Sequence, residues 1–101
     1  MLDSKDMSNH LMFCINEECG EVTQAIGKIL RFGFDSTHPE TQISNKNLLM
    51  NELIDLKAVI DEYLKGMDIS EYDILNRCES KLDKINHYYN EFIEAQIWVN
   101  I

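Results

Sequence analysis

The sequence predicts an all-α fold, a small bundle of three main helices. Apolar residues recur at steps of three and four along three segments, and no segment shows the alternation of a strand bounded by turns. The 101 residues leave room for one domain, spanning residues 1–101. Because a chain of this length buries little apolar surface alone, we expect dimerisation to complete the bundle into a four-helix-type core.

The first helix is expected over about residues 8–32. Five apolar residues give it helical periodicity: Leu11, Ile15, Val22, Ile26 and Ile29. Gly33 and the polar stretch at residues 35–39 are typical of a helix stop and a loop.

The second helix is expected to begin at Ser44 or Asn45 and to end at Lys65, with Gly66 as the C′ residue. Its apolar stripe is formed by Leu49, Leu53, Leu56, Ile60 and Leu64. This periodicity again predicts a helix that buries one side.

The third helix is expected to begin after Ser70, an N-cap with Asp73 three residues later. Its apolar residues alternate steps of three and four, a seam typical of lengthwise helix packing: Leu75, Cys78, Leu82, Ile85, Tyr89 and Phe92. The apolar tail, residues 97–101, is expected to dock on the body or on another subunit.

Composition excludes several functional classes. The chain has 9 basic and 18 acidic residues, a net charge of −9, so a nucleic-acid partner is not expected. No apolar run is long enough to span a membrane, and the polar start does not resemble a signal peptide, which makes the cytoplasm the expected location. Three cysteines without C-x-x-C spacing indicate reduced thiols.

Two acidic pairs occupy equivalent places on the first two helices. On a wheel of about 100° per residue, Glu18 and Glu52 each lie in the middle of the apolar stripe. Glu21 and Asp55 each follow three residues later, at about −60° on the flank. Each helix therefore presents one carboxylate within its apolar face and a second beside it.

This arrangement predicts a metal site. Ionised carboxylates in an apolar interface cost several kcal/mol unless they are paired or coordinate a metal. Oxygen ligands alone suit hard cations, so Mg²⁺ is expected, with Mn²⁺ as a substitute. Two other interpretations stay open: the pairs lie on solvated helix faces, or Glu18 or Glu52 forms a structural ion pair with Lys28, Arg31 or Lys57.

The same residues resemble a known family. The segments Glu-Glu-Cys-Gly-Glu at 17–21, Ala-Ile-Gly-Lys at 25–28 and Glu-Leu-Ile-Asp at 52–55 are similar to the E-x-x-E and E-x-x-D motifs of MazG-like nucleoside triphosphate pyrophosphohydrolases. The similarity covers about residues 11–64. It implies an all-α enzyme that hydrolyses a ribo- or deoxynucleoside triphosphate to the monophosphate and pyrophosphate, as a homodimer or a dimer of dimers.

By this resemblance Glu18, Glu21, Glu52 and Asp55 would be the Mg²⁺ ligands. Glu18 and its neighbour Glu17 are the catalytic candidates, with Glu17 polarising the attacking water. Four basic residues are candidates for contacting substrate phosphates: Lys28, Arg31, Lys81 and Lys84.

Some interpretations stay open beside this one. Glu17 and the basic residues also fit ordinary surface positions. Phe32 and Phe34 either stack on the base or pack in the core. A non-enzymatic helical module with an acidic, cation-binding cluster is the alternative function. A di-iron bundle is disfavoured, because no histidine lies three residues after a candidate glutamate.

Overall fold

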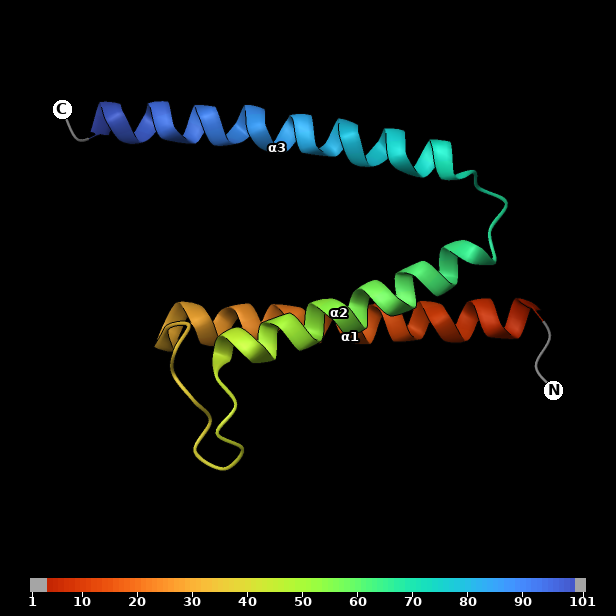
Figure 1. Cartoon of the computed structure of the whole chain (residues 1–101), viewed down its shortest axis with the longest axis horizontal. Helices are drawn as coiled ribbons and strands as arrows, with labels where there is room; N and C mark the ends of the chain where they lie inside the picture. The colour runs from red at the N-terminus through yellow and green to blue at the C-terminus, as the bar shows by residue number, and fades with distance from the viewer. Residues whose placement is uncertain (1–3, 100–101) are drawn as a thin grey trace. The chain divides into compact units, whose positions relative to one another are not determined.

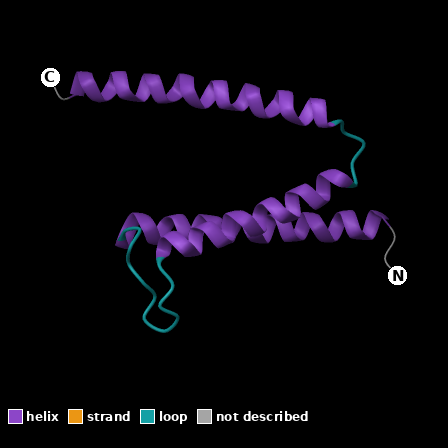
Figure 2. Ribbon diagram, viewed as in Figure 1, coloured by secondary structure: helices purple, strands orange, loops and turns teal. Residues whose placement is uncertain are grey.

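The computed structural model describes residues 4–99 and the side-chain surroundings of residues 5–96. Three helices follow one another, α1 (Ser4–Phe32), α2 (Asn45–Lys65) and α3 (Glu71–Val99) (Figure 1). Within residues 4–99 the structure has no strand (Figure 2). One isolated bridge pairs Thr37 with Ser44 in the loop. The predicted all-α class with three main helices is confirmed. The expected docking of the tail, residues 97–101, lies outside the described side chains.

The chain separates into two units. The first contains α1 and α2 and ends at Asp68, and the second begins at Ile69 and contains α3. In the first unit the two helices run antiparallel and in contact along their length, joined by the loop of residues 33–44 (Figure 1).

The α1–α2 contact surface follows the predicted stripes. Ala25, at 1% exposure, is the one fully buried apolar side chain among the residues whose burial is described. The half-buried side chains of the contact are Leu11, Ile15, Glu18, Val22 and Ile29 on α1, and Leu48, Leu49, Glu52, Leu56, Val59, Ile60 and Tyr63 on α2. The acidic residues Glu18 and Glu52 therefore do lie within the apolar stripe of each helix.

Two residues assigned to the stripes are exposed instead. Ile26 is 43% exposed and Leu53 is 40% exposed. On the helical wheel both lie about 80–100° from the central carboxylate of their helix. A single partner helix does not reach that far around, so this flank of the unit keeps an uncovered apolar edge.

The start of α1 differs most from the sequence prediction. The helix begins at Ser4, before the expected position near residue 8. Met7 and Leu11 line a cavity of about 280 Å³ together with Tyr63 of α2 and Met67, which follows that helix. The polar first turns of α1 thus have a partner helix beside them, which local sequence cannot reveal.

The end of α1 agrees with the prediction. Gly33 has a φ of 91°, in the left-handed region, and its N–H donates to the Ile29 carbonyl oxygen at 2.8 Å. Glycine adopts this conformation without the steric cost that a Cβ brings. The helix therefore stops at Phe32 and the chain turns into the loop.

The caps of α2 and α3 follow simple sequence signals. Ser44 precedes α2 with its Oγ accepting from the Asn47 N–H at 3.1 Å, and Ser70 precedes α3 with its Oγ accepting from the Asp73 N–H at 3.1 Å. Each hydroxyl satisfies a backbone donor that a helix start leaves unpaired. Gly66 differs slightly, since it is the C-cap of α2 with a φ of −79° and not a left-handed C′ residue.

The third helix, described by itself, presents an apolar seam to its surroundings. Leu75, Leu82, Ile85, Tyr89 and Phe92 are each at least half exposed. Their spacing is the predicted alternation of three and four. Among the described residues, none of the helices has an apolar stretch long enough to cross a lipid bilayer.

Candidate metal centre

Glu18 is the residue that α1 contributes to the candidate centre. Leu11 and Ile15 before it and Val22 and Ala25 after it direct the same side of the helix towards α2. Because residues three, four and seven apart share a helix face, burying these apolar side chains also carries the Glu18 carboxylate into the interface.

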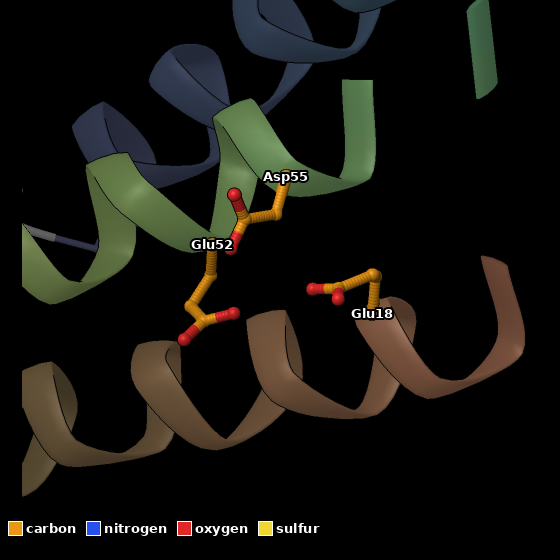
Figure 3. Close-up of side chains that lie close together, drawn as sticks. All are labelled: Glu18, Glu52 and Asp55. Atoms are coloured by element: carbon orange, nitrogen blue, oxygen red, sulfur yellow. The ribbon is translucent and has the colours of Figure 1, made fainter. Parts of the chain in front are cut away.

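Glu52 and Asp55 approach from α2. Glu52 is half-buried in the stripe that faces α1, and Asp55, three residues later, is exposed beside it. Side chains three residues apart are neighbours on a helix surface. Figure 3 shows the three carboxylates directed towards one another from the two helices.

One carboxylate oxygen from each of Glu18, Glu52 and Asp55 lies within 4.8 Å of the others. Glu18 supplies its oxygen from α1, and the other two come from α2 (Figure 3). Glu52 and Asp55 lie 34 and 37 positions after Glu18 in the sequence, yet the three residues form one cluster. The cluster therefore depends on the register in which the two helices pack.

The surroundings of Glu18 disfavour a charged carboxylate. Its Oε2 is shielded from solvent and has no hydrogen-bond partner among the described residues. Desolvation raises the pKa of this carboxyl group above its ordinary value, and the neighbouring charges of Asp55 and then Glu52 raise the pKa further. Burial and like charge both disfavour the ionised form.

The donor set fits a hard divalent cation. An unpartnered, shielded carboxylate oxygen within reach of two further carboxylates is compensated most directly by a positive ion placed among them. Carboxylate oxygens are the ligands that Mg²⁺ and Mn²⁺ prefer.

The ion-pair interpretation receives no support at Glu18. Lys57, one of the suggested partners, pairs with Asp61 at 2.6 Å on the exposed side of α2. The other ion pairs between described residues join Lys65 to Glu62 within α2 and His87 to Glu91 within α3. No described cation lies within 4 Å of the Glu18 or Glu52 carboxylate oxygens.

The remaining acidic candidates lie beside the cluster. Glu21 and Glu17 are exposed on α1 and do not belong to the close group of three. Their charges still raise the pKa of Glu18, after burial and the two α2 carboxylates. Glu21 as a fourth ligand and Glu17 as a catalytic residue both stay predictions.

The basic candidates divide between the two units. Lys28 and Arg31 are exposed on the last turns of α1, where Lys28 lines a cavity under the loop. Lys81 and Lys84 are exposed on α3, in the second unit. Phosphate contacts by these four residues stay predictions.

Sequence reasoning missed two residues near the centre. Asn45, at 8% exposure, donates from Nδ2 to the Gly33 carbonyl oxygen at 3.0 Å and so ties the end of α1 to the start of α2. His38 organises the loop between them, accepting at Nδ1 from the Glu40 N–H at 3.1 Å. The only signal was a polar loop longer than a turn requires.

Comparisons with known proteins leave the family undetermined. No protein-family model matches the chain, and neither a curated protein nor a solved structure matches it significantly.

Proposed function

We propose that this chain is a Mg²⁺-dependent nucleoside triphosphate pyrophosphohydrolase, which releases the nucleoside monophosphate and pyrophosphate. The observation that carries the proposal is the convergence of Glu18, Glu52 and Asp55 from two helices, with one shielded glutamate oxygen left without a partner. These residues come from the E-x-x-E and E-x-x-D segments that resemble the MazG-like family.

The chain's own residues would hold the ion and position the reaction. Glu18, Glu52 and Asp55 would supply oxygen ligands, and Glu21, one turn after Glu18, would be a fourth. When bound, a divalent cation neutralises phosphate charge and lowers the pKa of a coordinated water. Exposed Glu17 would accept a proton from the attacking water, and exposed Lys28 and Arg31 would hold phosphate oxygens.

The proposal includes a homodimer or a dimer of dimers. Its support is the small amount of buried apolar surface: Ala25 alone is fully buried among the apolar side chains described, whereas the α3 seam is exposed. Chains with so little core usually gain stability by association. The second copy would complete a four-helix-type core.

Hydrolysis is tested with ribo- and deoxynucleoside triphosphates, Mg²⁺ or Mn²⁺, and detection of pyrophosphate. We expect pyrophosphate and monophosphate in equal amounts from at least one substrate. Glu18→Gln and Glu52→Gln should each lower kcat at least about a hundredfold, since each removes a ligand charge. The matched control is Glu79→Gln, the same change at an exposed position on α3.

Circular dichroism distinguishes a loss of activity from a loss of folding. Both variants should keep the helical spectrum of the parent protein. Folded protein that releases no pyrophosphate from any triphosphate would contradict the proposal. In that case an absence of any Mg²⁺-dependent rise in Tm would also exclude the cation-binding module.

A further inference from the structure

The loop of residues 33–44 is stabilised by hydrogen bonds within its own backbone. His38 N–H donates to the Ile43 carbonyl oxygen at 3.1 Å, and Gln42 N–H donates to the His38 carbonyl oxygen at 2.9 Å. Asn45 N–H donates to the Ser36 carbonyl oxygen at 2.9 Å, next to the bridge between Thr37 and Ser44. The loop is therefore held in one conformation against the helix ends.

A cavity of about 310 Å³ lies under this loop. Its apolar walls are formed by Phe32 at the end of α1, by Pro39 and Ile43 of the loop, and by Leu48 of α2. Phe32 is 65% exposed, so its ring is available for contact and does not fill a core. The volume is at the lower end of the range for small-molecule sites, about 300–1,000 Å³.

Polar groups lie around the same cavity. His38 accepts at Nδ1 from the Glu40 and Thr41 N–H groups, so its neutral ring carries the proton on Nε2 and offers a donor there. Thr41 accepts at Oγ1 from the Ile43 N–H and keeps its hydroxyl proton for donation. Lys28 adds an ammonium group. An aromatic wall with hydrogen-bond donors beside it suits a flat heteroaromatic ring that carries acceptors.

The cavity also lies next to the carboxylate cluster. Leu48 is one helical turn before Glu52, about 6 Å along the axis of α2. Lys28 is ten residues after Glu18, about 15 Å along the axis of α1. A ligand with phosphates at the carboxylates would place a group attached to them at this cavity.

We infer that the cavity under the 33–44 loop is the nucleoside subsite, in which the base stacks on Phe32 and accepts a hydrogen bond from His38 Nε2. This assignment rests on the proposed function for the identity of the ligand. It adds a binding function for the loop and gives roles to two residues outside the acidic motifs. Phe32 and His38 bind the base, and Asn45 positions the loop that carries His38.

The test uses the full-length, ¹⁵N-labelled protein and titrates adenosine, guanosine, cytidine and uridine, together with their 5′-monophosphates, to millimolar concentration. We expect at least one of them to shift the amide signals of Phe32 and of residues 36–45. Phe32→Ala should weaken this binding about tenfold, because it removes the stacking surface. Phe13→Ala is the matched control, since Phe13 is also an exposed ring on α1 (75%, against 65% for Phe32) and lies outside the cavity.

A second variant isolates the histidine. His38→Asn keeps a side-chain acceptor near the position of Nδ1, for the loop N–H groups, and removes the Nε2 donor. We expect about fivefold weaker nucleoside binding with unchanged amide signals in the free loop. In hydrolysis assays both Phe32→Ala and His38→Asn should raise KM for triphosphates and leave kcat and the inhibition constant of inorganic triphosphate unchanged.

The outcomes separate this inference from the proposed activity. Triphosphate hydrolysis without nucleoside-induced shifts in the loop would overturn the subsite and leave the pyrophosphohydrolase standing. Nucleoside binding at the loop without hydrolysis would support the subsite and contradict the enzyme. Binding that Phe32→Ala and Phe13→Ala weaken equally would also overturn the assignment of Phe32.

Discussion

At the scale of single residues, Glu18 is the side chain on which the proposed function depends most. Apolar neighbours on α1 carry it into the interface, where Oε2 has no hydrogen-bond partner among the described residues and two carboxylates lie opposite. An unpaired charge in such surroundings destabilises a fold. A divalent cation would turn the same group into a stabilising ligand, so stability and cation binding should be linked at this residue.

Glu18→Gln should therefore change stability in opposite directions with and without metal. In EDTA at neutral pH we expect a higher Tm than that of the parent protein, because a shielded charge is removed while the side-chain shape is kept. With millimolar Mg²⁺ the parent protein should gain Tm and the variant should not. Thermal unfolding followed by circular dichroism measures both, with Glu79→Gln as the control. A lower Tm in EDTA would show that Glu18 has a stabilising partner.

The raised pKa of Glu18 also predicts a pH dependence. Between the ordinary pKa of 4.5 and the higher value in the folded protein, the folded state binds more protons than the unfolded state. Stability of the metal-free protein should thus fall as pH rises through this window. Urea unfolding from pH 4.5 upwards, in EDTA, gives the slope, and Glu18→Gln should reduce it. An identical slope in the variant would contradict the assignment to Glu18.

At the scale of elements, the register between α1 and α2 determines the candidate site. Asn45, the first residue of α2, helps to hold this register, because its side chain donates to the carbonyl oxygen of Gly33 at the end of α1. Moving either helix by one residue would rotate its carboxylate by about 100° away from the shared interface. The bonds between the loop and the helix ends therefore contribute to the geometry of the cluster.

Asn45→Ala should destabilise the protein by about 1–3 kcal/mol, since it removes the hydrogen bond that the buried Asn45 side chain donates to the Gly33 carbonyl oxygen. Asn47→Ala is the matched control, because it makes the same change at an exposed residue in the first turn of α2. The backbone N–H of residue 47, which donates to Ser44 Oγ in the cap, is kept in this variant. Urea unfolding of both variants gives the difference. Equal losses would mean that Asn45 contributes only its helix propensity.

At the scale of the whole molecule, exposed apolar surface is the dominant feature. Ile26 and Leu53 flank the α1–α2 unit, and the α3 seam that includes Leu82 is exposed over its described length. Each unit, described by itself, thus has apolar side chains that another helix could cover. The proposed association with a second copy would cover these side chains.

We expect sedimentation equilibrium to give a mass of at least twice 11.8 kDa at micromolar concentration. Leu82→Glu should shift the protein towards the monomer and lower its Tm, because it places a charge in the apolar seam. Ser80→Glu adds the same charge to the opposite face of α3 and should change neither. A parent protein that sediments as a stable monomer at high concentration would contradict the dimer.

The three helices, the Ser44 and Ser70 caps and the Gly33 stop could be predicted from sequence, because each depends on side chains within a few residues of one another. The wheel also placed Glu18 and Glu52 in the apolar stripes, since the 3.6-residue period alone decides which residues share a face. The early start of α1 and the exposure of Ile26 and Leu53 could not be predicted, because both depend on where a partner helix ends.

The sequence by itself thus determined an all-α chain with two in-phase acidic pairs. Only the tertiary structure decided that Asp55 joins Glu18 and Glu52 while Glu21 remains to one side, and that His38 and Phe32 border one cavity. The physical reason is that helix periodicity is a local property of the chain. The distance between two helices depends instead on how side chains from distant segments pack, and on the bonds of the loop that joins them.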